Sequence, residues 1–281
     1  MLFSSGENPY LCLHSKNFSL RYNKFPESNG RKASGETRVT RRFMKRLHII
    51  TPVKDSIDST LETVRAVMAA RINVPYTYTL YNDFSTPENT LRLEQAAREM
   101  GFQLVNLSNL TTHPSPNYLL VLQRERKLCL QEEAALLIVE SDVTVRPDTL
   151  QGLWQGAMER PQAGIVASVT VDEAGQINYP YLYARGHEHE IMETRRHCSF
   201  CCSLLTPELL HRVDFDRLDA SKSWFDVTIS HRSLEVGLRN YLFTSLPVLH
   251  RPHGSRPWKQ LKYTNPLKYY WLKLTKGLDK I

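Results

Sequence analysis

No segment of this 281-residue chain is apolar enough to cross a membrane, and the chain has only five cysteines. A spanning helix needs roughly 18–20 mostly apolar residues in a row, and none is present. The N-terminus has no signal-peptide core, because the apolar triplet Leu11-Cys12-Leu13 is interrupted at once by His14. An odd cysteine count in a chain of this length suits reduced thiols. Together these absences predict a cytoplasmic protein, either free or peripheral on the cytoplasmic face of a membrane.

The sequence also lacks a uniform distribution of charge, although its net charge is +7. Residues 1–46 carry ten Lys/Arg and three Glu, and residues 251–281 carry eight Lys/Arg and one Asp. The part between them has 18 basic and 25 acidic residues, which is a net charge of −7. A basic pI alone would suggest nucleic acid. Because the positive charge is confined to the two ends, no nucleic-acid partner is expected.

Composition divides the chain into three parts. Residues 1–43 are a basic leader that we predict to be disordered, since stretches such as PESNGRKASGETR show no hydrophobic period. Residues 44–255 are the predicted folded domain, with halves at 44–150 and 151–255, and residues 256–281 are a basic amphipathic tail. Met44 directly precedes the first predicted strand, so either Met1 or Met44 is the true start.

Hydrophobic periodicity predicts an α/β fold. Expected strands cover 47–53, 76–81, 102–106, 134–139 and 164–171, and expected helices cover 59–71, 87–100, 118–132 and 147–159. Such alternation predicts one mostly parallel, doubly wound sheet. After residue 172 the rhythm changes, with strands expected at 178–183, 199–205 and 241–249 and a helix at 225–236. This second half should contain a small antiparallel part.

Two carboxylates stand at the end of a buried strand. The apolar run 134–139 is followed by Glu140, Ser141 and Asp142. Desolvating an anion is costly unless it is paired or holds a metal, and open α/β sheets bind ligands at the carboxyl ends of their strands. A divalent cation serving a phosphate-bearing substrate fits this place. The structural alternative is an acidic turn that precedes a helix.

Five motifs follow one another between residues 47 and 250. The run LHIITPVKDSIDSTLETVRAV at 47–67 resembles the first strand and helix of glycosyltransferase family 2, and the turn YNDFST at 81–86 resembles the Asp-Asp-Gly-Ser-Thr turn of that family. Glu140-Ser141-Asp142 resembles its Asp-x-Asp metal motif. Asp226, which stands 11 residues before Gly237, and His250 take the places of a family Asp and His. The resemblance covers roughly 47–255 and implies a single A-type glycosyltransferase domain.

The resemblance also implies roles for individual residues. Asp142 and His250 would hold Mg²⁺ or Mn²⁺, with a diphosphate contact as the alternative for His250, and Asp226 would be the catalytic base. The implied donor-binding residues are Pro52, Val53, Asp55, Asp83, Arg124 and Glu140. Other interpretations remain open: Asp83 in an Asx turn, Arg124 on a solvated helix face, Asp226 as a helix cap and His253 in place of His250.

Three departures from the family pattern concern the same motifs. Glu140 replaces the usual first Asp of the metal motif, and Phe84 stands where Gly is common. Trp224 and Phe225 precede Asp226 without the usual acidic residue, so the base assignment depends on spacing.

The implied activity is inverting transfer of a sugar from a nucleotide-diphosphate sugar to a hydroxyl of a glycan or lipid-linked acceptor, as in polysaccharide biosynthesis. The first half would bind the donor and the second half the acceptor. One alternative is a nucleotidyltransferase of similar fold, which would want a Gly-rich phosphate loop that TPVKDS lacks. The other is a non-catalytic, basic-tailed adaptor that binds membranes or nucleic acid. Donor sugar, base, linkage and oligomeric state stay open.

Two further sequence features allow more than one interpretation. Three histidines and three cysteines gather between 187 and 202 and include a C-x-x-C spacing, but the absence of a second such pair favours a core strand over zinc. The tail places Leu267, Tyr270, Trp271, Leu274 and Leu278 on one helical face, with Lys268, Lys273 and Lys276 on the flanks and back. This face either rests on anionic lipid or packs on the domain.

Overall fold

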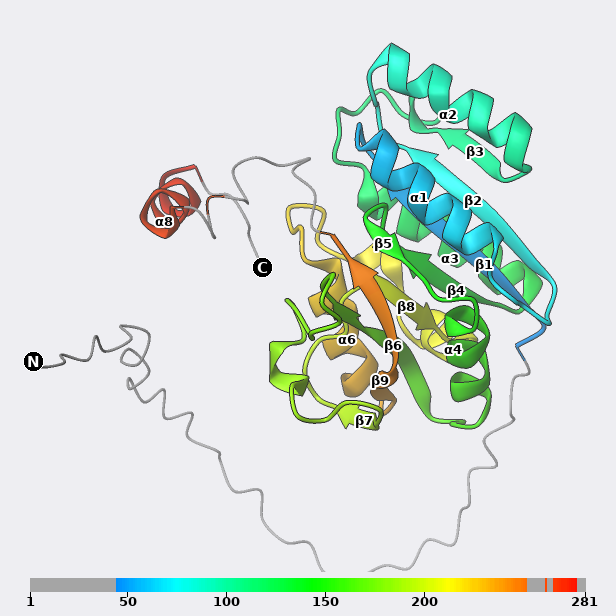
Figure 1. The fold of residues 1–281 in the computed structure, drawn as a ribbon, viewed down its shortest axis with the longest axis vertical. Helices are drawn as coiled ribbons and strands as arrows, with labels where there is room; N and C mark the ends of the chain where they lie inside the picture. The colour runs from blue at the N-terminus through cyan, green and yellow to red at the C-terminus, as the bar shows by residue number, and fades with distance from the viewer. Residues whose placement is uncertain (1–43, 252–260, 262–264, 277–281) are drawn as a thin grey trace, which may run out of the picture. The chain divides into compact units, whose positions relative to one another are not determined.

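The computed structural model describes residues 44–251, 261 and 265–276, and Figure 1 shows its fold. The strands are β1 (Arg46–Val53), β2 (Tyr76–Asn82), β3 (Gln103–Asn106), β4 (Ala134–Val139), β5 (Val143–Thr144), β6 (Ala163–Val171), β7 (Ile191–Thr194), β8 (Cys202–Leu205) and β9 (Arg239–His250). The helices are α1 (Ile57–Met68), α2 (Pro87–Met100), α3 (Tyr118–Glu132), α4 (Thr149–Met158), α5 (Pro207–Arg212), α6 (Phe225–Glu235) and α8 (Pro266–Thr275).

All of these strands form one mixed sheet in the order β3-β2-β1-β4-β8-β6-β9-β5, with β7 paired to β9. Strands β1 to β4 are parallel to one another, and β6 is parallel to β9. Strand β8 is inserted between β4 and β6 and runs antiparallel to both. As a result β1, β2, β4, β6 and β9 all end at one edge of the sheet, and β8 begins there.

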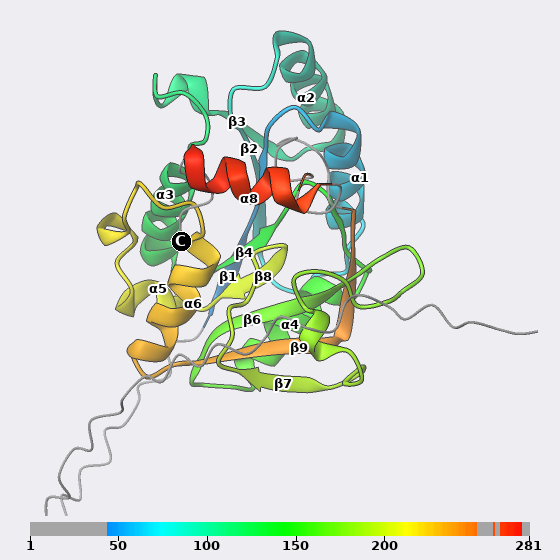
Figure 2. The ribbon, with the colours of Figure 1, turned by 90° about the vertical axis from the view of Figure 1, so that its left-hand side faces the viewer.

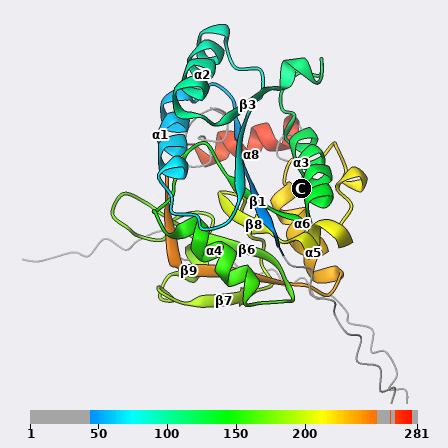
Figure 3. The same cartoon turned by 90° about the vertical axis from the view of Figure 1, so that its right-hand side faces the viewer.

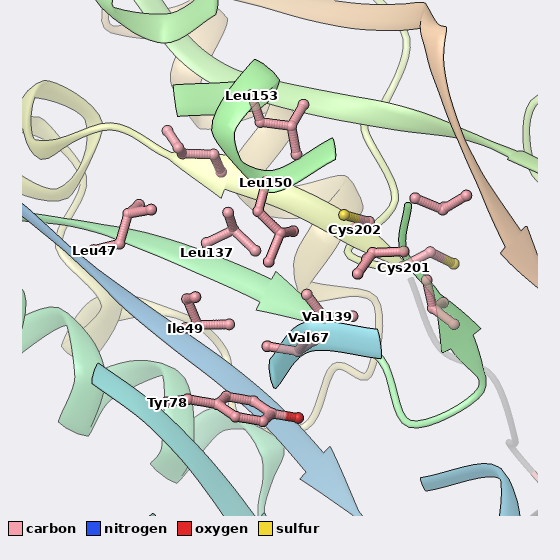
Figure 4. Close-up of a cluster of buried hydrophobic side chains, with 14 of the residues drawn as sticks. Leu47, Ile49, Val67, Tyr78, Leu137, Val139, Leu150, Leu153, Cys201 and Cys202 are labelled. Carbon is pink, nitrogen blue, oxygen red and sulfur yellow. The ribbon is translucent and has the colours of Figure 1, made fainter. Parts of the chain in front are cut away.

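Helices cover both faces of the sheet. Figures 2 and 3 show α1, α2 and α4 on one side of it and α3, α5 and α6 on the other. The core is accordingly split in two, and side chains alternate between the halves along each strand: Ile49 and Leu137 belong to the first, Ile50 and Leu136 to the second. Figure 4 shows part of the first half. Burial on both faces explains why β4 is apolar throughout.

Helix α2 illustrates how local sequence sets the elements. The Thr86 side chain accepts a hydrogen bond from the Asn89 backbone N–H, and Pro87 occupies the first helical position. The helix ends at Gly101, whose φ of 81° lies in the left-handed region that glycine adopts without strain.

The predicted fold class is confirmed, and so are most predicted elements up to residue 171. The strand expected at 178–183 is wrong. A turn forms there instead, in which the Tyr181 N–H donates to the Asn178 carbonyl, and Pro180 cannot donate to a strand neighbour. Strand β8 is shorter than expected, because Ser199 makes hydrogen bonds with Tyr181 rather than with a strand. The sequence interpretation missed β5, β7 and α5.

Within the described residues, no helix is long and apolar enough to cross a bilayer. Helix α8 forms where the tail pattern predicted it. Leu267, Trp271 and Leu274 on its apolar side are 85%, 61% and 84% exposed, whereas Tyr269 on the opposite side is buried. Leu278 and the leader 1–43 lie outside the described residues.

Candidate metal and donor site

The residues after β4 meet the end of β9 at the carboxyl edge of the sheet. Glu140 and Asp142 follow β4 directly, and β5 pairs Val143 with His250, the last residue of β9. The Arg251 N–H donates to the Asp142 carbonyl at 3.0 Å, which fixes the two segments side by side. The long-range order of the strands therefore brings together two predicted metal ligands that are 108 positions apart in the sequence.

Four potential ligand groups converge at this edge. His250 Nε2 lies 3.6 Å from Asp142 Oδ2, and the Cys201 Sγ lies 3.4 Å from Glu140 Oε2 and 4.0 Å from His250 Nε2. One ligand atom each from Glu140, Cys201 and His250 falls within 4.8 Å of the other two. Asp142, Cys201 and His250 are buried, and Glu140 is half-buried.

Burial and crowding change the protonation of this cluster. Burial, followed by the nearby charge of Asp142, raises the pKa of Glu140 to about 7. Burial alone would lower the pKa of His250, but its hydrogen bond to Asp142 and the negative charges of Asp142 and Glu140 outweigh burial and raise it. The two carboxylates thus repel each other and attract a positive group, which is the electrostatic environment that a bound cation would relieve.

Asp226 and Tyr118 face the same cluster from α6 and α3. The charge of Asp226 contributes to the raised pKa of Glu140. Burial, followed by the charges of Glu140 and Asp226, raises the pKa of the Tyr118 hydroxyl well above its usual range. Asp226 lies in the first turn of α6 and accepts a hydrogen bond from the Val227 N–H, while Trp224 occupies the cap position. The predicted catalytic base is therefore close enough to the predicted metal motif for its charge to act on Glu140.

The turn after β2 is built around Phe84 and Asp83. Phe84 has a φ of 57°, the left-handed conformation for which glycine is common at this place. The Asp83 carboxylate accepts hydrogen bonds from the Ser115 hydroxyl and from both the backbone and side-chain N–H groups of Asn117. These bonds fix the segment that leads into α3. A donor-binding role for Asp83 stays a prediction.

The other predicted donor residues are Pro52, Val53, Asp55 and Arg124. The Val53 carbonyl accepts from the Asp83 N–H, which joins the ends of β1 and β2, and Pro52 precedes it. Asp55 accepts from the Thr86 N–H and so fixes the start of α2. Arg124 is exposed on α3, and a donor-binding role for it stays a prediction.

Several basic residues follow β9 in the sequence. Arg251 is engaged by two exposed carboxylates, those of Glu62 and Glu173. His253, Arg256 and Lys259 lie outside the described residues.

The histidines and cysteines between 187 and 202 separate in the structure. His187 is exposed and hydrogen-bonds Glu190, whereas Cys198 and Cys202 are buried in the two halves of the core. Cys201 turns toward Glu140 and His250 instead. Figure 4 shows the sulfur atoms of Cys201 and Cys202 directed away from each other.

Sequence reasoning missed two residues of the site. Cys201 was considered only with its sequence neighbours, because nothing local shows that an antiparallel β8 begins beside the end of β4. The C-x-x-C spacing marked Cys201 as unusual but indicated the wrong partners. Tyr118 appeared only as the start of a helix, and no signal in the sequence could have shown its position.

The donor set fits a divalent cation. Glu140, Cys201 and His250 offer one oxygen, one sulfur and one nitrogen atom within 4.8 Å of one another, and Asp142 Oδ2 lies 3.6 Å from His250 Nε2. A tetrahedral ion with bonds of about 2.0–2.3 Å keeps its ligand atoms roughly 3.3–3.7 Å apart.

Comparison with known proteins identifies the fold. No family model and no curated protein matches the chain. Solved structures do match: Staphylococcus aureus TarS 1-349 has a TM-score of 0.52 and 14% identity over 73% of this chain and 60% of TarS. TarS in complex with UDP-GlcNAc gives 0.52 and 14% over 74% and 59%. The chain therefore has the A-type glycosyltransferase fold.

A second enzyme of this fold gives the same result. The mannosyltransferase PcManGT from Pyrobaculum calidifontis, in complex with GDP-Man and Mn²⁺, matches with a TM-score of 0.52 and 13% identity over 84% of this chain and 65% of its own. The chain spans less than two thirds of the length of each of these chains.

Proposed function

We propose that this protein is an inverting, divalent-metal-dependent glycosyltransferase that moves a sugar from a nucleotide-diphosphate sugar to a hydroxyl of a glycan or lipid-linked acceptor. The observation that carries the proposal is the convergence of Glu140, Asp142 and His250 at the carboxyl edge of a sheet with this fold. Structures of the same fold contain UDP-GlcNAc in one case and GDP-Man with Mn²⁺ in another.

Each polar group at the edge has a task in this reaction. Asp142 and His250 would hold the cation, and Glu140 would hold the donor ribose or a water on the cation. When bound, the cation neutralises the diphosphate as it leaves. Further donor contacts come from Pro52, Val53, Asp55, Asp83 and Arg124.

Asp226 activates the acceptor. Its carboxylate takes the proton of the acceptor hydroxyl as that oxygen bonds to the anomeric carbon, and the bond between that carbon and the diphosphate oxygen breaks on the opposite side. Attack and departure on opposite faces invert the anomeric centre.

A donor screen tests the proposal. The full-length chain is incubated with UDP- and GDP-sugars in the presence and absence of Mn²⁺ or Mg²⁺, and released nucleoside diphosphate is measured. We expect slow hydrolysis of one donor that requires the cation. If no donor is turned over and none stabilises the protein against heat with either cation, the proposal is wrong.

We also propose that α8 rests on an anionic membrane surface, which would bring the enzyme to lipid-linked acceptors. Leu267, Trp271 and Leu274 form an exposed apolar stripe, and Tyr269 on the other side of the helix is the buried residue. Lys268 and Lys276 are exposed and complement anionic headgroups. If α8 packed its apolar stripe on the domain, Leu267, Trp271 and Leu274 would be buried and Tyr269 would be exposed.

Sedimentation with vesicles of anionic and of zwitterionic lipid tests this contact. The double variant Leu267→Glu/Leu274→Glu should no longer pellet with anionic vesicles, while the control Thr275→Glu on the same helix should keep most of its binding. Equal pelleting of all three proteins, or pelleting of none, would mean that α8 has no membrane role.

A further inference from the structure

One group in the site, the Cys201 thiol, is not a usual ligand of hard cations. Mg²⁺ takes oxygen ligands, whereas a thiolate is a soft ligand that selects transition metals. Cys201 nevertheless stands with Glu140 on one side and His250 on the other, at 3.4 and 4.0 Å. Its side chain is positioned by the Ser199 hydroxyl, which lies 3.2 Å from the sulfur.

Backbone hydrogen bonds fix Cys201 next to Glu140. The Glu140 N–H donates to the Cys201 carbonyl at 2.9 Å, and Val139 pairs with Cys202 in the sheet. Cys201 is only 4% exposed, so its sulfur faces the cluster and not solvent. A histidine, a carboxylate and a cysteine held in this way match the common ligands of zinc in type and spacing.

We propose that Cys201 is a thiolate ligand of the cation bound by Asp142 and His250, and that the site therefore prefers a thiophilic transition-metal ion such as Zn²⁺ or Co²⁺ over Mg²⁺. The inference rests on the proposed cation site. On binding, the S–H bond breaks, its proton leaves to solvent and a metal–sulfur bond forms, with no change in oxidation state. Glu140 then supplies a fourth ligand or holds a metal-bound water.

Titration of the full-length protein with Co²⁺ tests the ligand directly. Thiolate coordination produces a sulfur-to-cobalt charge-transfer band in the near ultraviolet that oxygen and nitrogen ligands do not give. We expect this band in the wild type, its loss in Cys201→Ser, and its persistence in the control variants Cys202→Ser and Cys129→Ser. A tenfold excess of Mg²⁺ should not remove it. A band that survives in Cys201→Ser, or that Mg²⁺ displaces, would overturn the proposal.

A second measurement needs no variant. X-ray absorption of the zinc-loaded wild type should show one sulfur at about 2.3 Å. A shell of nitrogen and oxygen alone would show that Cys201 is not a ligand, and would leave the transferase proposal intact. If the sulfur is present but no sugar nucleotide is hydrolysed, the transferase proposal fails and the ligation of Cys201 stands.

Discussion

Among the residues that the structure describes, two clusters contain a histidine, a glutamate and a cysteine, and they are built differently. In the first, around Glu140, Cys201 and His250, the contacts run through sulfur: the Cys201 thiol lies 3.4 Å from Glu140 Oε2 and 4.0 Å from His250 Nε2. In the second, His48 of β1 hydrogen-bonds Glu125 of α3 at 3.0 Å, and the Tyr81 hydroxyl donates to the other oxygen of that carboxylate. Cys129 completes the second cluster.

The difference shows that residue type alone does not separate a ligand site from a structural network. Glu125 already has a partner for each oxygen, so a cation there would have to break hydrogen bonds that are expensive to lose. At the carboxyl edge the like charges of Glu140 and Asp142 are brought together, and the neighbour of Glu140 Oε2 is a weakly hydrogen-bonding thiol, so that a cation would add favourable interactions. We therefore expect the first cluster to govern activity and the second to govern stability.

Removing Asp142 should have the largest effect. Asp142→Ala should abolish metal-dependent donor binding and reduce sugar transfer by more than about 100-fold, because it deletes a direct ligand. The control Asp148→Ala changes an exposed carboxylate nearby that caps nothing, and it should behave as wild type. Isothermal titration with donor and Mn²⁺ measures donor binding by the two variants, and released nucleoside diphosphate measures transfer. Wild-type turnover in Asp142→Ala would reject the metal assignment.

Replacing the proposed base should separate binding from chemistry. Asp226→Asn keeps the shape of the side chain but cannot accept a proton, so transfer should fall about 10²–10⁴-fold with donor affinity unchanged. Steady-state kinetics and donor titration check the two quantities. Loss of donor binding to the same degree as in Asp142→Ala would make Asp226 a structural residue.

The second cluster should respond in the opposite way. Glu125→Ala removes the shared partner of His48 and Tyr81 from a buried place and should cost about 3–5 kcal/mol of unfolding free energy, or roughly 6–20 °C in Tm. Glu132→Ala, at the half-exposed partner of His48, should cost less than about 1 kcal/mol. Thermal unfolding measures both. Unchanged Tm in Glu125→Ala, or loss of metal binding without loss of stability, would contradict the comparison.

A pH series should show a smaller effect from His48. Burial lowers its pKa, but hydrogen bonds and charges of Glu125 and Glu132 outweigh burial and raise the pKa above the ordinary 6.5. His48 therefore adds stability that is fully present below pH 6.5 and is lost as pH rises through the folded-state pKa. The stability difference between wild type and His48→Gln should shrink as pH rises. A stability difference between the two proteins that grows as pH rises would contradict the raised pKa of His48.

Much of the fold could be predicted because its signals are local. Strand β4 is apolar at every position, and α2 carries a Thr-Pro start and a Gly end. The second half of the chain was harder to predict. The tyrosines at 179–183 favour a strand, but Pro180 and the turn at Asn178 prevent one. The turn-initiating pair Thr206-Pro207 was a usable signal for α5 that sequence reasoning passed over.

The candidate site was only partly accessible from sequence for a physical reason. Asp142 could be proposed because it follows an apolar strand of a parallel pattern, and His250 because it closes a strand and takes the place of a family histidine. Cys201 could not be placed, because its position depends on β8 being antiparallel to β4 and β6. The direction of a strand depends on contacts across the whole sheet.

We expect one edge of this sheet to bind a divalent cation and a nucleoside diphosphate together. The affinity for Mn²⁺ is measured with and without UDP or GDP, after correction for Mn²⁺ bound by free nucleotide. One nucleotide should tighten Mn²⁺ binding at least about tenfold, Mn²⁺ should tighten that nucleotide equally, and Asp142→Ala should remove the coupling. Equal Mn²⁺ affinity with and without both nucleotides would contradict this expectation.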